Sequence, residues 1–210
     1  MTEYKTVQEI FWAGQFGDEY IARNSDAKAI SSNVAFFSRA LKSAHDVRSC
    51  VEFGANIGLN LRTLRVLYPE QEQYAVEINA NASAELRKFL PAEKVFECSL
   101  LDFDQARLPH LCDLTFVKGV LIHIHPDHLR TAYSKLYAAS RRYVLVGEYY
   151  NPTPVNVPYR GHEGRLFKRD FAGELMDIYP DLELVDYGFA YRRDKDFPQD
   201  DITWFLLEKR

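Results

Sequence analysis

The chain carries an acid and two glycines at a spacing suited to holding a ligand that contains a nucleoside. Residues 51–58 read Val-Glu-Phe-Gly-Ala-Asn-Ile-Gly, which predicts a buried strand, a turn and the start of a helix. Glycine lacks a Cβ and adopts positive φ, so Gly54 and Gly58 let a ligand lie against bare backbone. A dinucleotide site needs a second glycine two residues after the first, to admit a pyrophosphate. Asn56 occupies that place and Glu52 precedes the first glycine, so the turn favours a different ligand.

A second acid, Glu77, ends the next predicted strand and precedes a predicted helix over residues 80–90. A carboxylate at this point of an α/β fold can accept hydrogen bonds from both hydroxyls of a ribose. The alternative is a solvated loop acid, but the position of Glu77 after the glycine turn favours ribose binding. Ile78 belongs to the same expected binding segment.

Leu101 and Asp102 follow the third predicted strand. Because open parallel sheets bind ligands at the carboxyl ends of their strands, both residues are candidates for an adenine site. The carboxylate of Asp102 could accept a hydrogen bond from the adenine amino group, with Leu101 packed on the ring. Asp102 is equally compatible with a loop acid or a helix cap.

Three histidines follow the fourth predicted strand, after Lys118 and Gly119, in a His-x-His-x-x-His pattern. The pattern spans a proline and has no acid or sulfur ligand at a matching spacing, so we expect no metal. Imidazole titrates near neutral pH, which makes His123 a candidate general base or orienting group. His125 is the alternative base, and a packed histidine at a strand end is the alternative role.

Residues 149–170 combine cations with aromatic rings after the fifth predicted strand. Three prolines between residues 152 and 158 cannot sit inside a sheet, and a basic loop is expected next. Arginine can bind carboxylate or phosphate, and tyrosine can stack on a sugar or base, so the mixture favours an anionic, ring-bearing substrate. A solvated basic loop paired with the acidic residues 194–201 is the alternative. The candidate residues are Tyr149, Tyr150, Asn151, Tyr159, Arg160, His162 and Lys168.

Short apolar strands alternate with amphipathic helices, which predicts an α/β fold with a parallel sheet covered on both faces. A helical, aromatic-rich cap over residues 1–45 precedes them, and two C-terminal runs predict a closing antiparallel hairpin. We expect one domain over residues 1–210, with residues 149–170 as an insertion facing the substrate. The predicted strands are 49–53, 74–77, 95–99, 114–118, 143–148, 182–191 and 202–208; helices are predicted at 31–42 and 170–178 and from residues 58, 79 and 126.

Bulk properties limit the function classes. A length of 210 residues suits one α/β domain, and no uncharged apolar run approaches the ~20 residues of a membrane span. A net charge of −4 argues against a nucleic acid as the main partner. Cys50, Cys98 and Cys112 are widely spaced in predicted strands, which favours buried thiols in a reducing cytoplasm.

The glycine turn resembles motif I of the class I S-adenosylmethionine (SAM) methyltransferases. Most of the chain further resembles the methylases associated with pseudaminic acid biosynthesis in bacteria. One departure is His125, where that family has asparagine. The resemblance is carried by FWAGQFGDEYIARN at 11–24, VEFGANIGLNL at 51–61, GVLIHIHPDHL at 119–129, EYYNPTPVNVPYRGHEGRLFKRDF at 148–171 and DDITWFLLEK at 200–209.

The resemblance implies a Rossmann-like, seven-stranded class I methyltransferase fold with an N-terminal helical lid and SAM as cofactor. We expect a cytoplasmic methyltransferase that acts on a small anionic sugar or sugar-nucleotide of nonulosonic acid or surface-polysaccharide biosynthesis, without nucleic acid or membrane partners. The alternatives are an NAD-dependent oxidoreductase and a non-catalytic binding partner. The expected residues are His123, Tyr149 and Tyr150 for catalysis, and Trp12, Tyr20, Arg23, Asn24, Glu52, Gly54, Asn56, Gly58, Glu77, Ile78, Leu101, Asp102, Lys118 and Gly119 for the cofactor.

Overall fold

The computed structural model describes residues 4–23 and 27–210, without the side chains of residues 22, 23, 27 and 28. In the described residues, seven strands form the main sheet. Their order is β3-β2-β1-β4-β5-β9-β8. The first five strands are parallel, and β9 pairs antiparallel with both β5 and β8. The strands are β1 (Ser49–Phe53), β2 (Glu72–Glu77), β3 (Val95–Glu97), β4 (Cys112–Lys118), β5 (Ser140–Glu148), β8 (Leu182–Ala190) and β9 (Ile202–Lys209).

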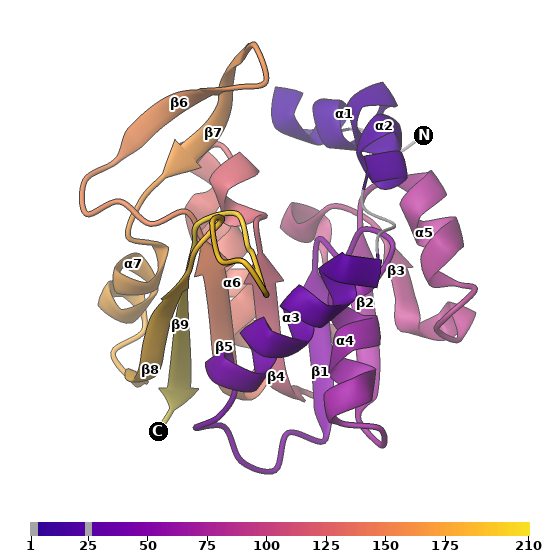
Figure 1. Ribbon diagram of the computed structural model, residues 1–210, viewed down its shortest axis with the longest axis vertical. Helices are drawn as coiled ribbons and strands as arrows, with labels where there is room; N and C mark the ends of the chain where they lie inside the picture. Colours follow the sequence, from indigo (N-terminus) through magenta and orange to yellow (C-terminus); the bar gives the residue numbers. More distant parts are fainter. Residues whose placement is uncertain (1–3, 24–26) are drawn as a thin grey trace.

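Helices cover both faces of this sheet, each over its own apolar core (Figure 1). One core contains Phe37 of α3 and Leu64 of α4, and the other contains Tyr133 of α6 and Phe171 of α7. All five side chains of β1 are buried, as expected for a central parallel strand. The predicted mostly parallel sheet with helices on both faces is thereby confirmed. These helices are α3 (Ala27–Ala40), α4 (Leu59–Leu67), α5 (Ala80–Leu86), α6 (Leu129–Ala139) and α7 (Phe171–Ile178).

The strand order reverses between β1 and β4, which lie side by side at the centre of the sheet. From β1 the chain builds outward through β2 to β3, and from β4 it builds the other way through β5. Open α/β sheets bind ligands in the crevice at such a switch point, outside the carboxyl ends of the strands. The turns after β1, β2 and β4 meet at this edge.

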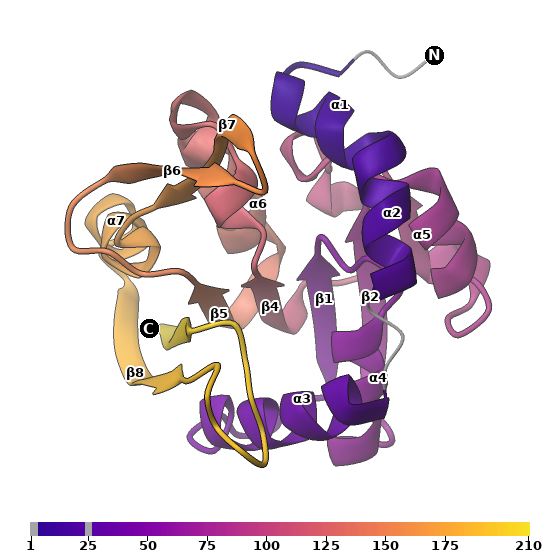
Figure 2. The same cartoon turned by 45° about the horizontal axis from the view of Figure 1, so that its top comes forward.

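Two helices lie above this edge, α1 (Val7–Ala13) and α2 (Gln15–Arg23), as Figure 2 shows. A capping box starts α1, because the Thr6 side chain accepts from the backbone of Glu9 while the Glu9 carboxylate accepts from the backbone of Thr6. Gly14 separates the two helices with an extended backbone. The predicted helical N-terminal segment is present as three helices rather than two.

The proline-rich insertion forms a separate hairpin, β6 (Val155–Tyr159) with β7 (His162–Lys168), outside the main sheet. The expectation of a basic loop at this place was wrong. Pro158 has no N–H to donate, and the register shifts between Val157 and Tyr159, so the pairing bypasses it. Arg160 and Gly161 have φ of 50° and 84° and make the turn at the tip.

Other differences from the predicted elements are small. β3 ends at Glu97, because Ser99 caps a short 3-10 turn over Leu100–Asp102. Cys98 consequently lies after the strand and is half-buried, whereas Cys50 and Cys112 are buried as predicted. A 3-10 turn at Pro126–His128 precedes α6. Of the helices in the described residues, none has the length and apolar character needed to cross a membrane.

Candidate cofactor and acceptor site

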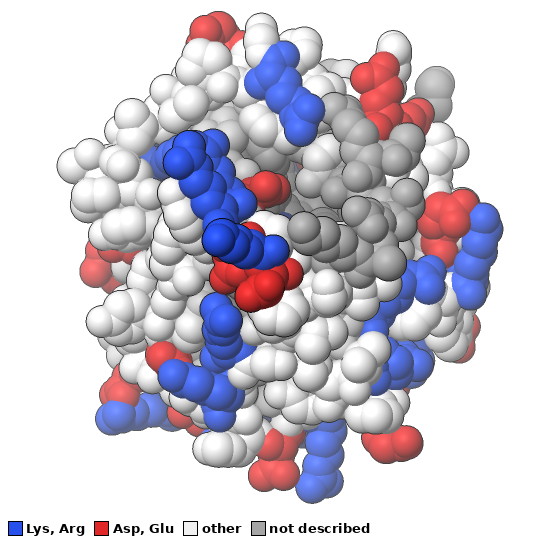
Figure 3. All heavy atoms as spheres, viewed as in Figure 1, with Lys and Arg blue, Asp and Glu red and all other residues white. Residues whose placement is uncertain are grey.

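A cavity of about 450 Å³ lies at the carboxyl ends of β1, β2 and β4. Figure 3 shows a hollow in this face of the molecule, with basic side chains beside it and acidic atoms within it. The lining combines residues from α1, α2 and α3, the turns after four strands, and the loop between β8 and β9. Among the expected cofactor residues, the lining contains Trp12, Tyr20, Gly54, Asn56, Glu77, Ile78, Lys118 and Gly119.

Gly54 opens the turn after β1 with a φ of 77°. A Cβ added there would lie 2.5 Å from Cγ2 of Val120, which also lines the cavity. Glycine is therefore required at this position both by the backbone conformation and by the approach of the neighbouring segment. Asn56 has a φ of 47°, which asparagine tolerates better than most residues.

Gly58 lies outside the lining of the cavity and begins α4 with a φ of 80°. A Cβ there would lie 2.8 Å from Cδ2 of Leu86 on α5. Its contribution is therefore to the shape of the turn and to the close packing of two helices. Gly58 was expected to contact a cofactor directly, and its place outside the lining does not favour such a contact.

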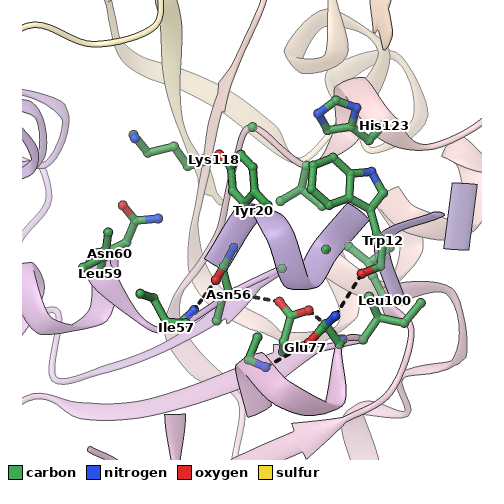
Figure 4. Close-up of a pocket in the computed structure, with 18 of the residues that line it drawn as sticks. Trp12, Tyr20, Asn56, Ile57, Leu59, Asn60, Glu77, Leu100, Lys118 and His123 are labelled. Carbon is green, nitrogen blue, oxygen red and sulfur yellow. Dashed lines mark hydrogen bonds between the residues drawn. The ribbon is translucent and has the colours of Figure 1, made fainter. Parts of the chain in front are cut away.

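Glu77 ends β2 beneath the glycine turn, 7% exposed (Figure 4). One carboxylate oxygen accepts from the backbone N–H of Asn56 at 2.7 Å, and the other accepts from that of Asn79 at 2.8 Å. Burial raises the pKa of Glu77, and these hydrogen bonds oppose the rise. Each carboxylate oxygen can accept a second hydrogen bond, so the group remains able to accept from a diol in the cavity.

The lining after β3 consists of Cys98, Ser99 and Leu100. Leu101 is buried in the core instead, and the carboxylate of Asp102 pairs with the Lys5 side chain. The Ser99 hydroxyl accepts from the backbone of Leu101 and starts the 3-10 turn that directs these side chains away. Leu101 and Asp102, the residues expected to contact adenine, therefore lie outside the cavity lining, and Ser99 and Leu100 lie in it.

The N-terminal helices are fixed over the cavity by Asn79. Its amide donates to the backbone carbonyl of Trp12 at 3.3 Å and to the carboxylate of Asp18 at 2.8 Å. The indole N–H of Trp12 is buried and has no hydrogen-bond partner among the described residues. Arg23 ends α2 with its side chain outside the described atoms, and Asn24 lies outside the described residues.

Aromatic rings from α1, α2 and the β6–β7 hairpin form a cluster around His123, which we call the aromatic roof. Trp12 and Tyr159 have ring centroids 4.7 and 4.8 Å from that of His123. Gln8 of α1 also donates to the backbone carbonyl of Gly164 in the hairpin. The roof consists of Phe11, Trp12, Phe16, His123, Tyr159 and His162.

His123 is 7% exposed and lines the cavity after β4. Its Nδ1 lies 2.6 Å from the backbone carbonyl of Arg165, which can only accept, so Nδ1 carries the proton and Nε2 is the acceptor. Burial lowers the pKa of His123 to about 4, so the ring is neutral at physiological pH. His125 is half-buried, with its Nδ1 3.5 Å from the carboxylate of Asp127. No three described His, Cys, Asp or Glu side chains are grouped as a metal site.

The residues expected to bind the acceptor lie outside the cavity lining. Tyr149 packs against both cores beneath Lys168, whose Nζ lies 5.3 Å from its ring centroid. Tyr150 is 40% exposed and packs on Phe205, because successive side chains at the end of a strand point to opposite faces. Of the others, Asn151 donates to Thr153, Tyr159 and His162 join the aromatic roof, and Arg160 lies at the hairpin tip.

A chain of side-chain amides lines the cavity and was not foreseen from the sequence. Gln199, in the loop between β8 and β9, donates to Asn33 of α3, and Asn33 donates to Asn60 of α4, each at 3.0 Å. Asn60 donates to Glu52 at 2.6 Å. These residues are far apart in the sequence and of ordinary types, so no local pattern points to them. Glu9, Arg192 and Asp200 of the lining were missed for the same reason.

Two buried acids support the turns that border the cavity. Glu52 is 1% exposed, accepts from Asn60 and leaves Oε2 without a partner among the described residues. Glu148, at the end of β5, accepts from the backbone N–H groups of Val120 and Leu121 at 2.9 Å. Burial raises the pKa of Glu52 to about 8 and that of Glu148 to about 7. Glu52 thus positions Asn60 from outside the lining, and Glu148 fixes the turn that carries His123.

The raised pKa of Glu52 predicts a pH-dependent stability. Between pH 4.5 and about 8 the folded protein holds a proton on Glu52 that the unfolded chain releases, so the free energy of unfolding falls as pH rises. Glu52→Gln should remove this loss, and should be more stable than the parent at pH 8 by on the order of 4 kcal/mol. The two proteins should converge near pH 4.5.

Urea unfolding of both proteins at several pH values measures this difference. Glu93→Gln, at an exposed position, is the matched control and should follow the parent at every pH. A stability gap between Glu52→Gln and the parent that stays constant from pH 4.5 to 8 would refute the buried, protonated state of Glu52.

Solved structures of methyltransferases share this fold. The mitomycin 7-O-methyltransferase MmcR is similar over 98% of this chain, which spans 61% of that protein, at 12% identity and a TM-score of 0.66. CalS10, an amino pentose methyltransferase from Micromonospora echinaspora solved with SAM, is 12% identical over 100% of this chain and 99% of its own, at a TM-score of 0.64. The 1,6-didemethyltoxoflavin-N1-methyltransferase of Burkholderia thailandensis, solved with S-adenosylhomocysteine, is 14% identical. The similarity covers 99% of this chain and 93% of that protein, at a TM-score of 0.67.

The structural similarity to these proteins establishes the architecture of the chain. The chain has the Rossmann-like fold of SAM-dependent methyltransferases. No protein-family model and no curated protein matches the sequence.

Proposed function

We propose that this protein is a SAM-dependent methyltransferase. The observation that carries the proposal is the cavity at the β1/β4 switch point, which places the glycine turn opposite Glu77. Gly54 leaves room against Val120 that a side chain would fill, and Glu77 offers carboxylate lone pairs to a ribose. Ser99 and Leu100 would border the adenine. The methyltransferase fold, including neighbours solved with SAM or S-adenosylhomocysteine, supports the same cofactor.

The glycine turn fits a dinucleotide poorly. Dinucleotide folds bind pyrophosphate at a glycine-rich turn and helix N-terminus, with a second glycine that lets the backbone approach. Here the N–H of Asn56 is donated to Glu77, and that of Ile57 is donated to the Asn56 side chain at 2.7 Å. The N–H of Gly58 is donated to the carbonyl of Ala55. The turn therefore holds itself together instead of presenting donors to a phosphate.

Thermal unfolding with added ligand tests the cofactor. S-adenosylhomocysteine binds the folded protein in our proposal, so it should raise the Tm, by an amount that grows with ligand concentration. NAD at the same concentrations should leave the Tm unchanged. A rise in the Tm with NAD and none with S-adenosylhomocysteine would contradict the proposal and favour the NAD-dependent oxidoreductase.

The residues around His123 are suited to prepare an acceptor for methyl transfer. When bound, SAM supplies an electrophilic methyl group on a sulfonium. The Nε2 lone pair of His123 can remove or orient the proton of an acceptor hydroxyl or amine, while the Arg165 carbonyl holds the ring in that tautomer. The aromatic roof and the N-terminal helices would act as a lid that excludes water from this end of the cavity.

For the acceptor, we propose a small anionic sugar or sugar-nucleotide of nonulosonic acid or surface-polysaccharide biosynthesis. The resemblance to the pseudaminic acid-associated methylases supports this class, and so does the likeness to a methyltransferase of an amino pentose. Lys168 and Arg160 of the hairpin are available to an anionic group that extends past the aromatic roof. We place the reaction in the cytoplasm, where the three free cysteines stay reduced.

Labelling identifies the acceptor and separates an enzyme from a binding partner. The protein is incubated with methyl-labelled SAM and a bacterial metabolite extract, and labelled products are found by mass spectrometry. Release of S-adenosylhomocysteine with a labelled sugar supports the proposal. Cofactor binding without release of S-adenosylhomocysteine in any extract would favour a non-catalytic partner.

A further inference from the structure

Two side chains of opposite charge, Lys118 and Asp200, line the cavity without forming an ion pair with each other. Lys118 ends β4 at the centre of the sheet, and Asp200 lies in the loop that joins β8 to β9. Within the described residues, neither side chain makes a hydrogen bond or an ion pair. Asp200 is nevertheless close enough for its charge to raise the pKa of Lys118 against the lowering effect of burial.

The buried acids Glu52 and Glu148 also lie near enough for their charges to raise the pKa of Lys118, but neither forms an ion pair with it among the described residues. Glu52 accepts from Asn60, and Glu148 accepts from backbone N–H groups after β4. The Lys118 ammonium lies 5.3 Å from the ring centroid of Phe36, which gives it an apolar neighbour but no acceptor. A half-buried ammonium is costly without an acceptor, so a ligand atom with negative charge fits this place.

The Lys118 side chain lies on the same side of the cavity as the start of α4. Lys118 and Asn60 both line the cavity and both lie near Glu52, and Figure 4 draws the two side chains at the cavity wall. Leu59 and Asn60 are the first two residues of that nine-residue helix. The N-terminus of a helix carries partial positive charge, which adds to the charge of Lys118. On the loop side, Asp200 supplies the negative charge. The cavity therefore presents a positive and a negative group to one ligand.

We propose that Lys118 and Asp200 bind the α-amino acid group of the cofactor, with the ammonium of Lys118 at its carboxylate and the carboxylate of Asp200 at its amine. This assignment rests on the function proposed above. It gives the loop between β8 and β9 a part in cofactor binding, because the loop supplies one of the two charges. The amide chain from Gln199 to Asn33 holds the same loop against α3.

Two probes isolate the α-amino acid group. S-adenosylhomocysteine contains it, and 5′-methylthioadenosine has the same adenosine and sulfur without it. Lys118→Met should weaken the affinity for S-adenosylhomocysteine about 10- to 100-fold, as expected for the loss of a charge-assisted hydrogen bond. The same variant should change the affinity for methylthioadenosine less than about twofold. Calorimetric titration measures both affinities. Asp200→Asn should weaken the affinity for S-adenosylhomocysteine by about 5- to 10-fold. The loss is smaller than for Lys118→Met because Asp200 is exposed and solvent screens its charge.

Matched controls separate this site from general charge effects. Lys195→Met and Asp196→Asn remove the same charges from exposed positions of the same loop outside the cavity, and should leave both affinities unchanged. Lys118→Arg keeps the charge and should retain most of the S-adenosylhomocysteine affinity. The Tm of each variant without ligand reports whether it is folded.

The results separate this inference from the proposed function. Equal losses for both probes in Lys118→Met would make Lys118 a structural residue and overturn the inference, as would unchanged affinity for both. Unchanged S-adenosylhomocysteine affinity with a raised KM for the acceptor would assign the two charges to the acceptor instead. If the parent protein binds neither probe, the proposed function fails and this inference fails with it.

Discussion

Gly54→Ala is expected to weaken the binding of S-adenosylhomocysteine about 100-fold, which corresponds to about 2.7 kcal/mol. The new Cβ would lie 2.5 Å from Cγ2 and 3.1 Å from Cγ1 of Val120. Valine is branched at Cβ and rotates little, so either the glycine turn or the segment after β4 must move. Both border the cavity. Calorimetric titration of parent and variant measures the loss.

Two further variants separate the steric cause from backbone strain. Gly161→Ala also places alanine at positive φ, 84°, but its Cβ meets nothing within 4 Å and it lies at the hairpin tip. It should cost stability and leave cofactor affinity unchanged. The double variant Gly54→Ala/Val120→Ala removes the clashing methyl groups and should recover part of the affinity. Full affinity in Gly54→Ala itself would show that the cofactor does not depend on this turn.

Much of the fold could be predicted because its signals are local. A short apolar run ending in an acid, followed by a glycine turn and an amphipathic helix, predicts β1, the turn and α4 without reference to the rest of the chain. Glu77 was found in the same way, from its place after β2. The structure brings both of these features to one cavity, as the switch-point rule requires.

The errors come from side-chain direction and from pairing across the chain. Tyr149 and Tyr150 are adjacent in sequence, yet Tyr149 packs into the core and Tyr150 faces outward, and neither lines the cavity. The prolines predicted a segment outside any sheet, so the β6–β7 hairpin was missed. Strand pairing around Pro158 requires a register shift that no local sequence signal indicates. The third strand ends at Glu97 rather than at residue 99, and the 3-10 turn that Ser99 starts takes Asp102 away from the cavity.

The least predictable part of the site is the wall formed by α3 and the β8–β9 loop. Asn33 and Gln199 are 166 residues apart in the chain and meet only because β9 returns to pair with β5, next to the central strand β4. Neither residue type is unusual at its position. Knowledge of the strand order would have been needed to bring Lys118 and Asp200 to the same cavity.

His123→Gln is expected to lower the rate of methyl transfer about 100-fold, with S-adenosylhomocysteine affinity changed less than about twofold. His123 lines the cavity, and its bond from Nδ1 to the Arg165 carbonyl leaves the lone pair on Nε2 as the basic site of the ring; glutamine is a far weaker base. The pKa of His123 is lowered to about 4 by burial. The parent should therefore keep a constant kcat/KM from pH 8 down to about pH 5, and lose it as His123 becomes protonated near pH 4.

The neighbouring histidine provides the control, since His125 is the alternative base and lies half-buried beside Asp127, outside the cavity lining. His125→Gln should keep the parent's rate and pH profile with the acceptor identified by labelling. A loss in His125→Gln with a normal His123→Gln would transfer the role to His125. A rate that falls with a pKa near 6.5 would likewise exclude His123 as placed here, because an imidazole with that pKa would have to be solvated rather than buried beneath Trp12 and Tyr159.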